Sequence, residues 1–150
     1  MAIHPLTGVS YEIHQELDSP TIPSDSQIFA WLSFNAGKLN DHISTFYEYV
    51  ESDYSPQLET DEKSILKALY FQTYYTNKAR SALIGAEDNS VLSLKDDVSS
   101  VSFVNRKEVA KEYRNIATEY SNEACHLANL YKHNRSGPRD IASSPTGYHW

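Results

Sequence analysis

The stretch Leu92–Asn115, LSLKDDVSSVSFVNRKEVAKEYRN, decides how the helical part of this chain is organised. It opens with alternating apolar and polar residues and closes as a strongly patterned helix. About 18 residues, from Glu87 to Val104, separate the two longest predicted helices, whereas a helical hairpin needs only about 2–8. The sequence therefore predicts an extended inter-helix loop, or a short β-ribbon, that carries Val98, Val101 and Phe103.

This loop has two interpretations. It either folds back over the end of the hairpin, as surface loops commonly do, or projects and contacts another protein chain. Its apolar residues argue against disorder, because disordered segments are poor in such residues. We favour the projecting loop and expect Val98, Val101 and Phe103 to be partner-binding residues.

Two long helices are predicted on either side of the loop, over residues 61–86 and 105–133. Asn105 and Glu108 have the spacing of a capping box, and Gly137–Pro138 cannot continue a helix. Complementary apolar stripes favour packing as a long antiparallel hairpin rather than as a free coiled coil. The stripe of the second helix consists of Val109, Tyr113, Ile116, Tyr120, Leu127 and Leu130.

Two shorter helices are expected before the hairpin. The first begins near residues 24–26, where serine and aspartate side chains can accept from free backbone N–H groups, and stops at Gly37. The second covers residues 39–51, where four apolar residues fall at i, i+3, i+4 and i+7. These four residues are Ile43, Phe46, Tyr47 and Val50.

The two ends of the chain are predicted to be extended arms. Residues 1–25 show no sustained period, are interrupted by proline and glycine, and carry a net charge of -4. Residues 134–150 contain two prolines and end with aromatic residues, so Tyr148 and Trp150 are expected to dock on a partner. The predicted fold is all-α, with a helical body over residues 26–133.

Charge and composition exclude several classes of protein. The net charge of -7 opposes phosphate binding, so we do not expect specific contacts with nucleic acid. The mean hydropathy is -0.54, and no apolar run approaches the roughly 18 residues of a membrane span. The first 20 residues lack the pattern of a signal peptide. Eleven tyrosines suit either a small core or surfaces that become buried on association.

Catalytic and metal-binding patterns are not found in the sequence. The single Cys125 precludes a CxxC site, and it points about 100° away from its neighbour His126 on a helix. Asp96–Asp97 lacks calcium-loop spacing, and no glycine-rich phosphate loop occurs. We therefore expect no enzyme activity, no cofactor and no metal.

A long helix, the loop LSLKDDVSSV and the segment VNRKEVAKEYRNIATEYSNEACHLANLYKHNRSGP resemble the head-to-tail adaptor proteins of tailed bacteriophages. Members of that family often carry an L-K-E-G-D-S-S-like loop before the last long helix and a Y-R-x-N-like ending to that helix. Leu94–Asp97 and Ser99–Val101 correspond to the loop, and Tyr131–Arg135 corresponds to the ending. Asp97–Val98 departs from the usual Gly-Asp. The resemblance covers residues 58–139.

The resemblance implies a structural virion protein of the neck region, assembled in the host cytoplasm. Such adaptors form a ring, commonly dodecameric, between the portal protein and the tail-side neck proteins. They extend the channel through which DNA passes without specific binding. On this hypothesis, deleting residues 138–150 leaves the helical body folded and abolishes assembly.

An alternative from another class is a small helical protein-binding module or regulator that acts as a monomer or dimer. Exposed arms predict an expanded chain in isolation, whereas a regulator is expected to be compact. An enzyme that uses a carboxylate or His126 is a third hypothesis, which the spacing of these residues does not support.

Overall fold

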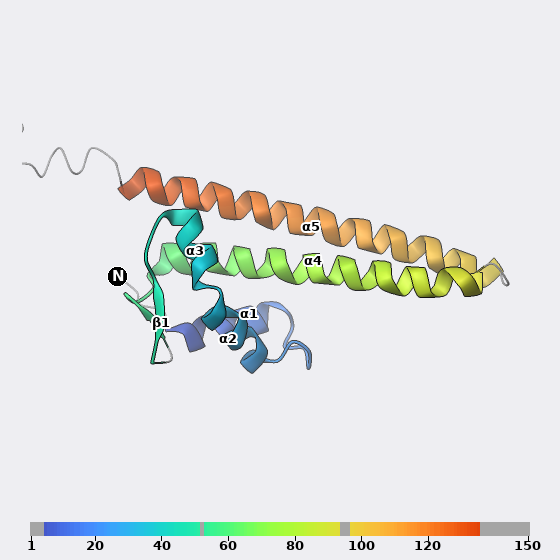
Figure 1. Cartoon of the computed structure of the whole chain (residues 1–150), viewed down its shortest axis with the longest axis horizontal. Helices are drawn as coiled ribbons and strands as arrows, with labels where there is room; N and C mark the ends of the chain where they lie inside the picture. The colour runs from blue at the N-terminus through green and yellow to red at the C-terminus, as the bar shows by residue number, and fades with distance from the viewer. Residues whose placement is uncertain (1–4, 52, 94–96, 136–150) are drawn as a thin grey trace, which may run out of the picture. The chain divides into compact units, whose positions relative to one another are not determined.

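The computed structural model describes residues 5–51, 53–93 and 97–135, with the backbone alone over 85–93 and 97–105. Within these residues the protein is mostly helical, as predicted, with five helices and one small antiparallel sheet that the sequence did not predict (Figure 1). The chain divides into two compact units. The first unit comprises Met1–Leu66 and Ala124–Trp150, and the second comprises Lys67–Glu123.

The predicted extended N-terminal arm is wrong over α1 (Leu6–Glu16), which is an α-helix. Its buried residues Leu6, Val9 and Ile13 lie at i, i+3 and i+7, the spacing of one helical face. No side chain of the helix's own N-cap closes its first turn. Instead, the backbone N–H of Leu6 donates to Oδ1 of Asp53 at 3.2 Å, from a position 47 residues away. The start of this helix therefore cannot be predicted from the neighbouring residues alone.

The predicted start of the next helix is confirmed. Ser24 is the N-cap of α2 (Asp25–Phe34) and forms a capping box with Gln27. The N–H of Gln27 donates to the Ser24 hydroxyl at 3.3 Å, and the N–H of Ser24 donates to the Gln27 amide oxygen at 2.8 Å. These bonds satisfy two backbone donors that a helix start leaves free.

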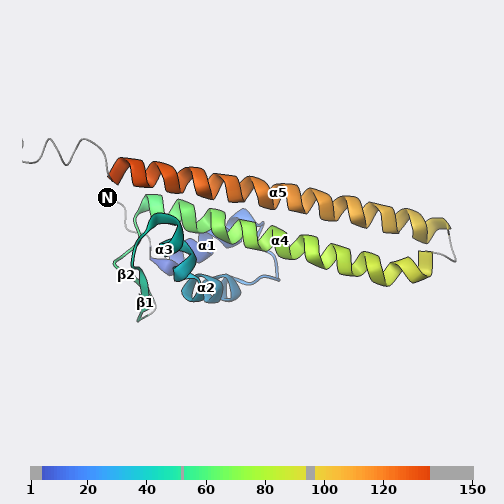
Figure 2. The same ribbon diagram turned by 45° about the horizontal axis from the view of Figure 1, so that its top comes forward.

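The predicted helix over residues 39–51 is correct as far as Ile43 and wrong beyond it. α3 (Ala36–Ile43) ends at Ser44, which adopts a left-handed conformation, and Gly37 lies inside α3 rather than ending a helix. The chain then forms a hairpin of β1 (Glu48–Val50) and β2 (Asp53–Ser55), in which Tyr49 pairs with Tyr54. Figure 2 shows this hairpin beside α3.

The core of the first unit is assembled from its helices and from β2. The hydroxyl of the buried Tyr54 donates to the carbonyl of Leu32, which ties β2 to the end of α2. Lys63 of α4 pairs with Glu12 of α1 at 2.7 Å. Buried apolar residues of this unit include Leu6, Val9, Ile13, Ile28, Leu32, Leu39, Ile43, Tyr47, Tyr54, Leu58, Ile65 and Leu66.

The predicted long inter-helix loop is also wrong. α4 (Thr60–Ser93) continues beyond residue 86, and α5 (Asp97–Arg135) begins before residue 105. Asn105 and Glu108 therefore lie inside α5 and do not cap its start. The physical reason is that residues 86–136 contain neither glycine nor proline, the two residues that most strongly interrupt helices, so both helices extend into the predicted loop.

In the second unit, α4 and α5 run side by side in both views (Figures 1 and 2). Phe71 stacks on Tyr120 at 5.1 Å between ring centroids, and Tyr75 lies 6.1 Å from Tyr113. Residue numbers rise along α4 as they fall along α5, so the two segments are antiparallel, as predicted. We call Phe71, Tyr75, Tyr113 and Tyr120 the aromatic ladder.

The buried face of α5 differs from the predicted apolar stripe. Val109 and Leu130 are exposed, whereas Ala110, Ala117 and Ala124 are buried at intervals of seven residues. Small side chains allow helices to approach closely, so alanines occupy the middle of the face and larger residues flank it. The seven-residue spacing of the buried face was predicted correctly, but the residues at the centre of that face were not.

Candidate functional site

The side chain of Asn40 shapes the segment that follows α3. Its Oδ1 accepts from the backbone N–H of Tyr47 at 2.7 Å, and its Nδ2 donates to the carbonyl of Tyr47 at 2.9 Å. The same Oδ1 accepts from the hydroxyl of Thr45 at 3.0 Å. As a result, Tyr47 is directed into the first unit while Phe46 is 92% exposed.

Glu62 is the most unusual side chain of the first unit, because it is a carboxylate only 1% exposed. It lies in the first turn of α4, where the helix dipole favours negative charge. Its Oε1 accepts from the hydroxyl of Tyr47 at 3.0 Å and from Nη2 of Arg135 at 3.4 Å. The start of α4 and the end of α5 therefore share one polar contact.

Arg135 binds two carboxylates, those of Glu59 and Glu62. Its Nη2 also donates to Oε2 of Glu59 at 3.2 Å, and its guanidinium lies 4.8 Å from the ring centroid of Tyr131. The Arg135 side chain is about half exposed, so its pairing with Glu59 contributes little, on the order of 0–1 kcal/mol. The pairing with the buried Glu62 is screened far less.

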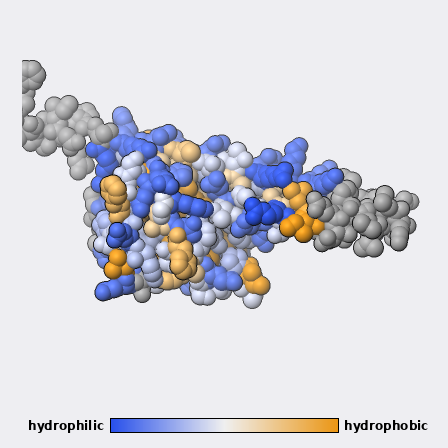
Figure 3. All heavy atoms as spheres, viewed as in Figure 1, coloured by the Kyte–Doolittle hydropathy of each residue, from blue (hydrophilic) through white to orange (hydrophobic). Residues whose placement is uncertain are grey.

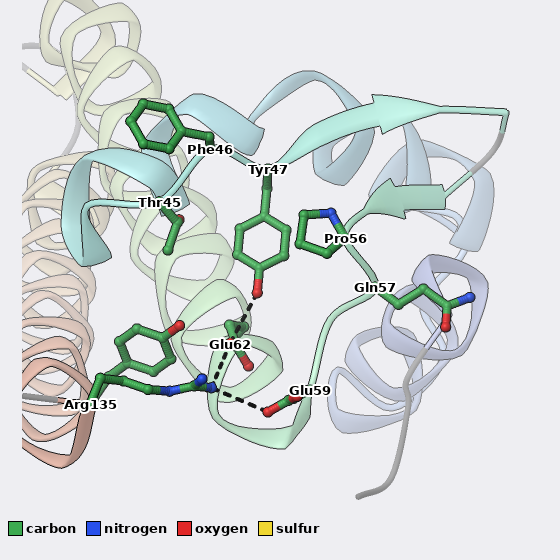
Figure 4. A pocket seen from close by; sticks show the side chains of 9 residues that line it. Thr45, Phe46, Tyr47, Pro56, Gln57, Glu59, Glu62 and Arg135 are labelled. Atoms are coloured by element: carbon green, nitrogen blue, oxygen red, sulfur yellow. Dashed lines mark hydrogen bonds and ion pairs between the residues drawn. The ribbon is translucent and has the colours of Figure 1, made fainter. Parts of the chain in front are cut away.

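These residues surround a cavity of about 470 Å³, within the range of ligand pockets. Figure 4 shows Tyr47 and Arg135 pointing toward Glu62 from different elements, and Phe46 turned away from it. We call this cavity the Glu62 pocket. Its lining consists of Thr45, Phe46, Tyr47, Pro56, Gln57, Glu59, Glu62, Tyr131 and Arg135.

The second carboxylate oxygen of Glu62 has no hydrogen-bond partner among the described residues, although it is buried. A buried acceptor left unpaired costs on the order of 1–3 kcal/mol, and a charged one costs more. The pocket also carries two carboxylates, Glu59 and Glu62, against the single guanidinium of Arg135. It therefore has a formal charge of minus one and a free acceptor.

The tyrosines around Glu62 are held in their neutral form. Burial, followed by the hydrogen bond to Glu62, raises the pKa of Tyr47 well above its usual range. Burial and the charge of Glu62 also raise the pKa of Tyr131, while Arg135 opposes this rise. Both hydroxyls stay protonated near neutral pH, and that of Tyr47 donates to Glu62, which suits a pocket that stabilises a carboxylate.

The partner-binding residues predicted from the sequence have side chains that the structure does not describe. Val98, Val101 and Phe103 belong to α5, but their side chains lie outside the described part of the structure. Tyr148 and Trp150 lie outside the described residues altogether. Their predicted role in binding partners stays a prediction.

The sequence did contain one signal for the Glu62 pocket. Glu62 occupies a position in the heptad-like register of α4 with Leu66 and Leu69, both of which are buried. A carboxylate in an apolar register indicates a buried, partnered charge. The partners could not be found in this way, because Tyr47 and Arg135 are 15 and 73 residues distant.

Over the described ranges, no three histidine, cysteine or acidic side chains come together as they would around a metal ion. Among the helices described, none is both long and apolar enough to cross a bilayer. A polar hollow of the second unit, about 330 Å³, is lined by Gln72, Thr76, Arg114, Ala117, Thr118 and Ser121.

Comparisons with family models, with curated proteins and with solved structures give no significant match to this chain.

Proposed function

We propose that the protein is a structural component that binds other protein chains, namely the neck adaptor of a tailed bacteriophage. The observation that carries the binding role is the outward placement of Phe46, which the Asn40 contacts hold in an almost fully exposed position. Phe34, at the end of α2, is 87% exposed as well. Large aromatic residues on a surface commonly anchor protein–protein contacts.

The surface around Phe34 and Phe46 also suits specific association with a protein rather than non-specific aggregation. Figure 3 shows a largely hydrophilic face interrupted by separate hydrophobic patches. Isolated apolar groups within a polar surface resemble the anchors and rims of protein interfaces. The described polar cluster is a charge pair with tyrosine donors, and its geometry favours holding elements together over bond-breaking chemistry.

The specific identification as a neck adaptor rests on the sequence resemblance. Two long antiparallel helices agree with the part of the resemblance that covers the helices. The part based on the loop is weaker, because Ser99, Ser100 and Val101 belong to α5. The acidic balance suits a channel wall past which DNA slides, since cationic walls would hold phosphates.

In this function, copies of the chain form a closed ring, dodecameric in the family, between portal and tail-side neck proteins. A ring requires two different surfaces on each copy that fit one another and close. The protein has no catalytic role in this proposal, uses no cofactor or metal, and resides in the neck of the virion.

The test is the molar mass from light scattering, measured for the chain alone and after mixing with a candidate portal complex. The expected result is a small species alone and many copies bound to the portal. A portal that retains its own mass after mixing overturns the adaptor proposal.

A monomeric or dimeric binding module is the second candidate function. The Glu62 pocket favours it to the extent that a cavity of this size takes a single side chain rather than a large surface. A chain of unchanged small mass that binds one copy of a partner protein supports this candidate over the adaptor.

A further inference from the structure

We propose that the Glu62 pocket receives the guanidinium of an arginine side chain presented by a partner protein. This inference rests on the proposed function and deepens it, because it states which chemistry the partner must offer. The Glu62 carboxylate is almost completely buried, and its Oε2 has no hydrogen-bond partner in the described structure. A donor from outside the first unit would satisfy that oxygen.

Charge selects a cation as this donor. Glu59 and Glu62 face a single Arg135, so one further positive charge makes the pocket neutral. The chain as a whole carries -7, which attracts a basic surface over longer distances. An anionic or neutral donor is attracted neither by the charge of the pocket nor by the net charge of the chain.

The lining selects arginine over other cations. Tyr47 and Tyr131 present aromatic rings beside the carboxylate, and Arg135 already lies against the ring of Tyr131. A planar guanidinium can stack on such rings and donate in the plane at the same time, which an ammonium cannot do. It is also weakly hydrated, so it enters a partly buried site more readily than lysine.

Phe46 supplies the apolar rim of the same site. It lines the pocket, yet its side chain is exposed and turned away from Glu62 (Figure 4). Arginine anchors at interfaces are commonly surrounded by apolar contacts that exclude water. The partner therefore presents an arginine next to an apolar residue that covers Phe46.

The first experiment uses the full chain and acetyl-arginine-amide as the probe, with backbone amide chemical shifts as the readout. Saturable shifts are expected at Thr45 and Gln57, with a Kd on the order of 1 mM. Acetyl-citrulline-amide has nearly the same shape without the charge and should bind at least about tenfold more weakly. Equal binding of the two probes, or no saturation with the arginine probe, overturns the proposal.

Two further probes separate arginine from other cations. Acetyl-lysine-amide should bind several-fold more weakly, and equal or tighter binding overturns the choice of arginine. Agmatine carries the same guanidinium as a free small molecule. If agmatine binds about tenfold tighter than acetyl-arginine-amide, the pocket takes a small-molecule cation and the protein-partner proposal is wrong.

Three variants locate the site. Glu62→Gln should weaken the arginine probe about tenfold or more, and Glu59→Gln, at a half-exposed position that tolerates change, about two- to threefold. Arg135→Gln should strengthen binding several-fold, because it removes the internal guanidinium that competes for Glu62. Weaker binding in a folded Arg135→Gln variant contradicts the proposal, since a purely structural role predicts no gain.

Light scattering with the portal complex separates the arginine-site proposal from the neck-adaptor proposal on which it rests. If the wild-type chain joins the portal but Glu62→Gln joins equally well, the arginine site is wrong and the adaptor stands. If the wild-type chain binds the arginine probe but ignores portals, the adaptor is wrong and the arginine site stands.

Discussion

The two units solve the same packing problem in different ways, since each holds a segment of α4 against a segment of α5. The first unit uses a buried carboxylate, a guanidinium and tyrosine hydroxyls. The second uses the aromatic ladder, in which Tyr75 and Tyr120 are almost parallel, with 5° between their planes. Polar contacts demand exact partners, whereas stacked rings tolerate small shifts. Specific recognition is therefore expected in the first unit and mechanical support in the second.

The largest effect is expected from Glu62→Ala, which should lower the free energy of unfolding by about 3 kcal/mol. The substitution leaves the hydroxyl of Tyr47 and the guanidinium of Arg135 without their shared acceptor. Chemical denaturation followed by circular dichroism measures the loss. The matched control is Glu59→Ala, which removes the more exposed carboxylate from the same arginine and should cost under about 1 kcal/mol. Equal losses would show that burial does not distinguish the two acids.

In the second unit, Tyr75→Ala should cost about 2 kcal/mol, because it removes the ring that contacts both Tyr113 and Tyr120. Tyr75→Phe keeps the ring and should stay within about 0.5 kcal/mol of the wild-type protein. The same denaturation measurement applies. If phenylalanine costs as much as alanine, the ladder depends on a hydroxyl and the contrast between the units disappears.

Alkaline pH should weaken the second unit through Tyr70. Burial, with a smaller contribution from Tyr74, raises the pKa of Tyr70 to about 12. The folded protein thus holds a proton that the unfolded chain releases near pH 10, so this stabilising contribution is complete below pH 10 and is lost as the pH rises toward 12. The expected loss is about 2 kcal/mol. Tyr70→Phe should remove that part of the pH dependence, and an unchanged slope in unfolding experiments between pH 9 and 12 contradicts the assignment.

The smallest effect is expected at the start of α1. Asp53→Ala removes the acceptor of the Leu6 N–H and should cost about 1 kcal/mol. Amide hydrogen exchange should become faster in the first turn of α1 and at the Tyr54 N–H, which donates to the same oxygen at 2.8 Å, and nowhere else in the first unit. Asp41→Ala, at an exposed position of α3, is the control and should leave both stability and exchange unchanged. Uniformly faster exchange across the first unit would show that Asp53 does more than cap one helix.

The features predicted correctly from the sequence are those with local causes. The start of α2 needs only a side-chain acceptor just before an apolar run, and the long helices need only a sustained period. The features missed depend on distant partners. α1 takes its cap from Asp53, and α3 is ended by contacts between Asn40 and Tyr47 rather than by a glycine or proline.

The Glu62 pocket follows the same rule. The sequence shows the Glu62 carboxylate in an apolar register. It does not identify the partners Tyr47 and Arg135, because they come from the segment before β1 and from the end of α5. The error over residues 87–104 has a different source. Polar residues favour a loop in a reading of the sequence, but residues 87–93 belong to α4 and residues 97–104 to α5, because helices tolerate polar residues where glycine and proline are lacking.

The 73-residue separation between Glu62 and Arg135 also bears on the order in which the protein can fold as it is synthesised. The second unit is contiguous in sequence, so its helices can pair as soon as Glu123 has emerged. The first unit cannot complete its polar contact until Arg135 has been made, well after Glu62 itself. Until then Glu62 lacks the guanidinium of Arg135, so the polar contact of the first unit is the last of these contacts to form.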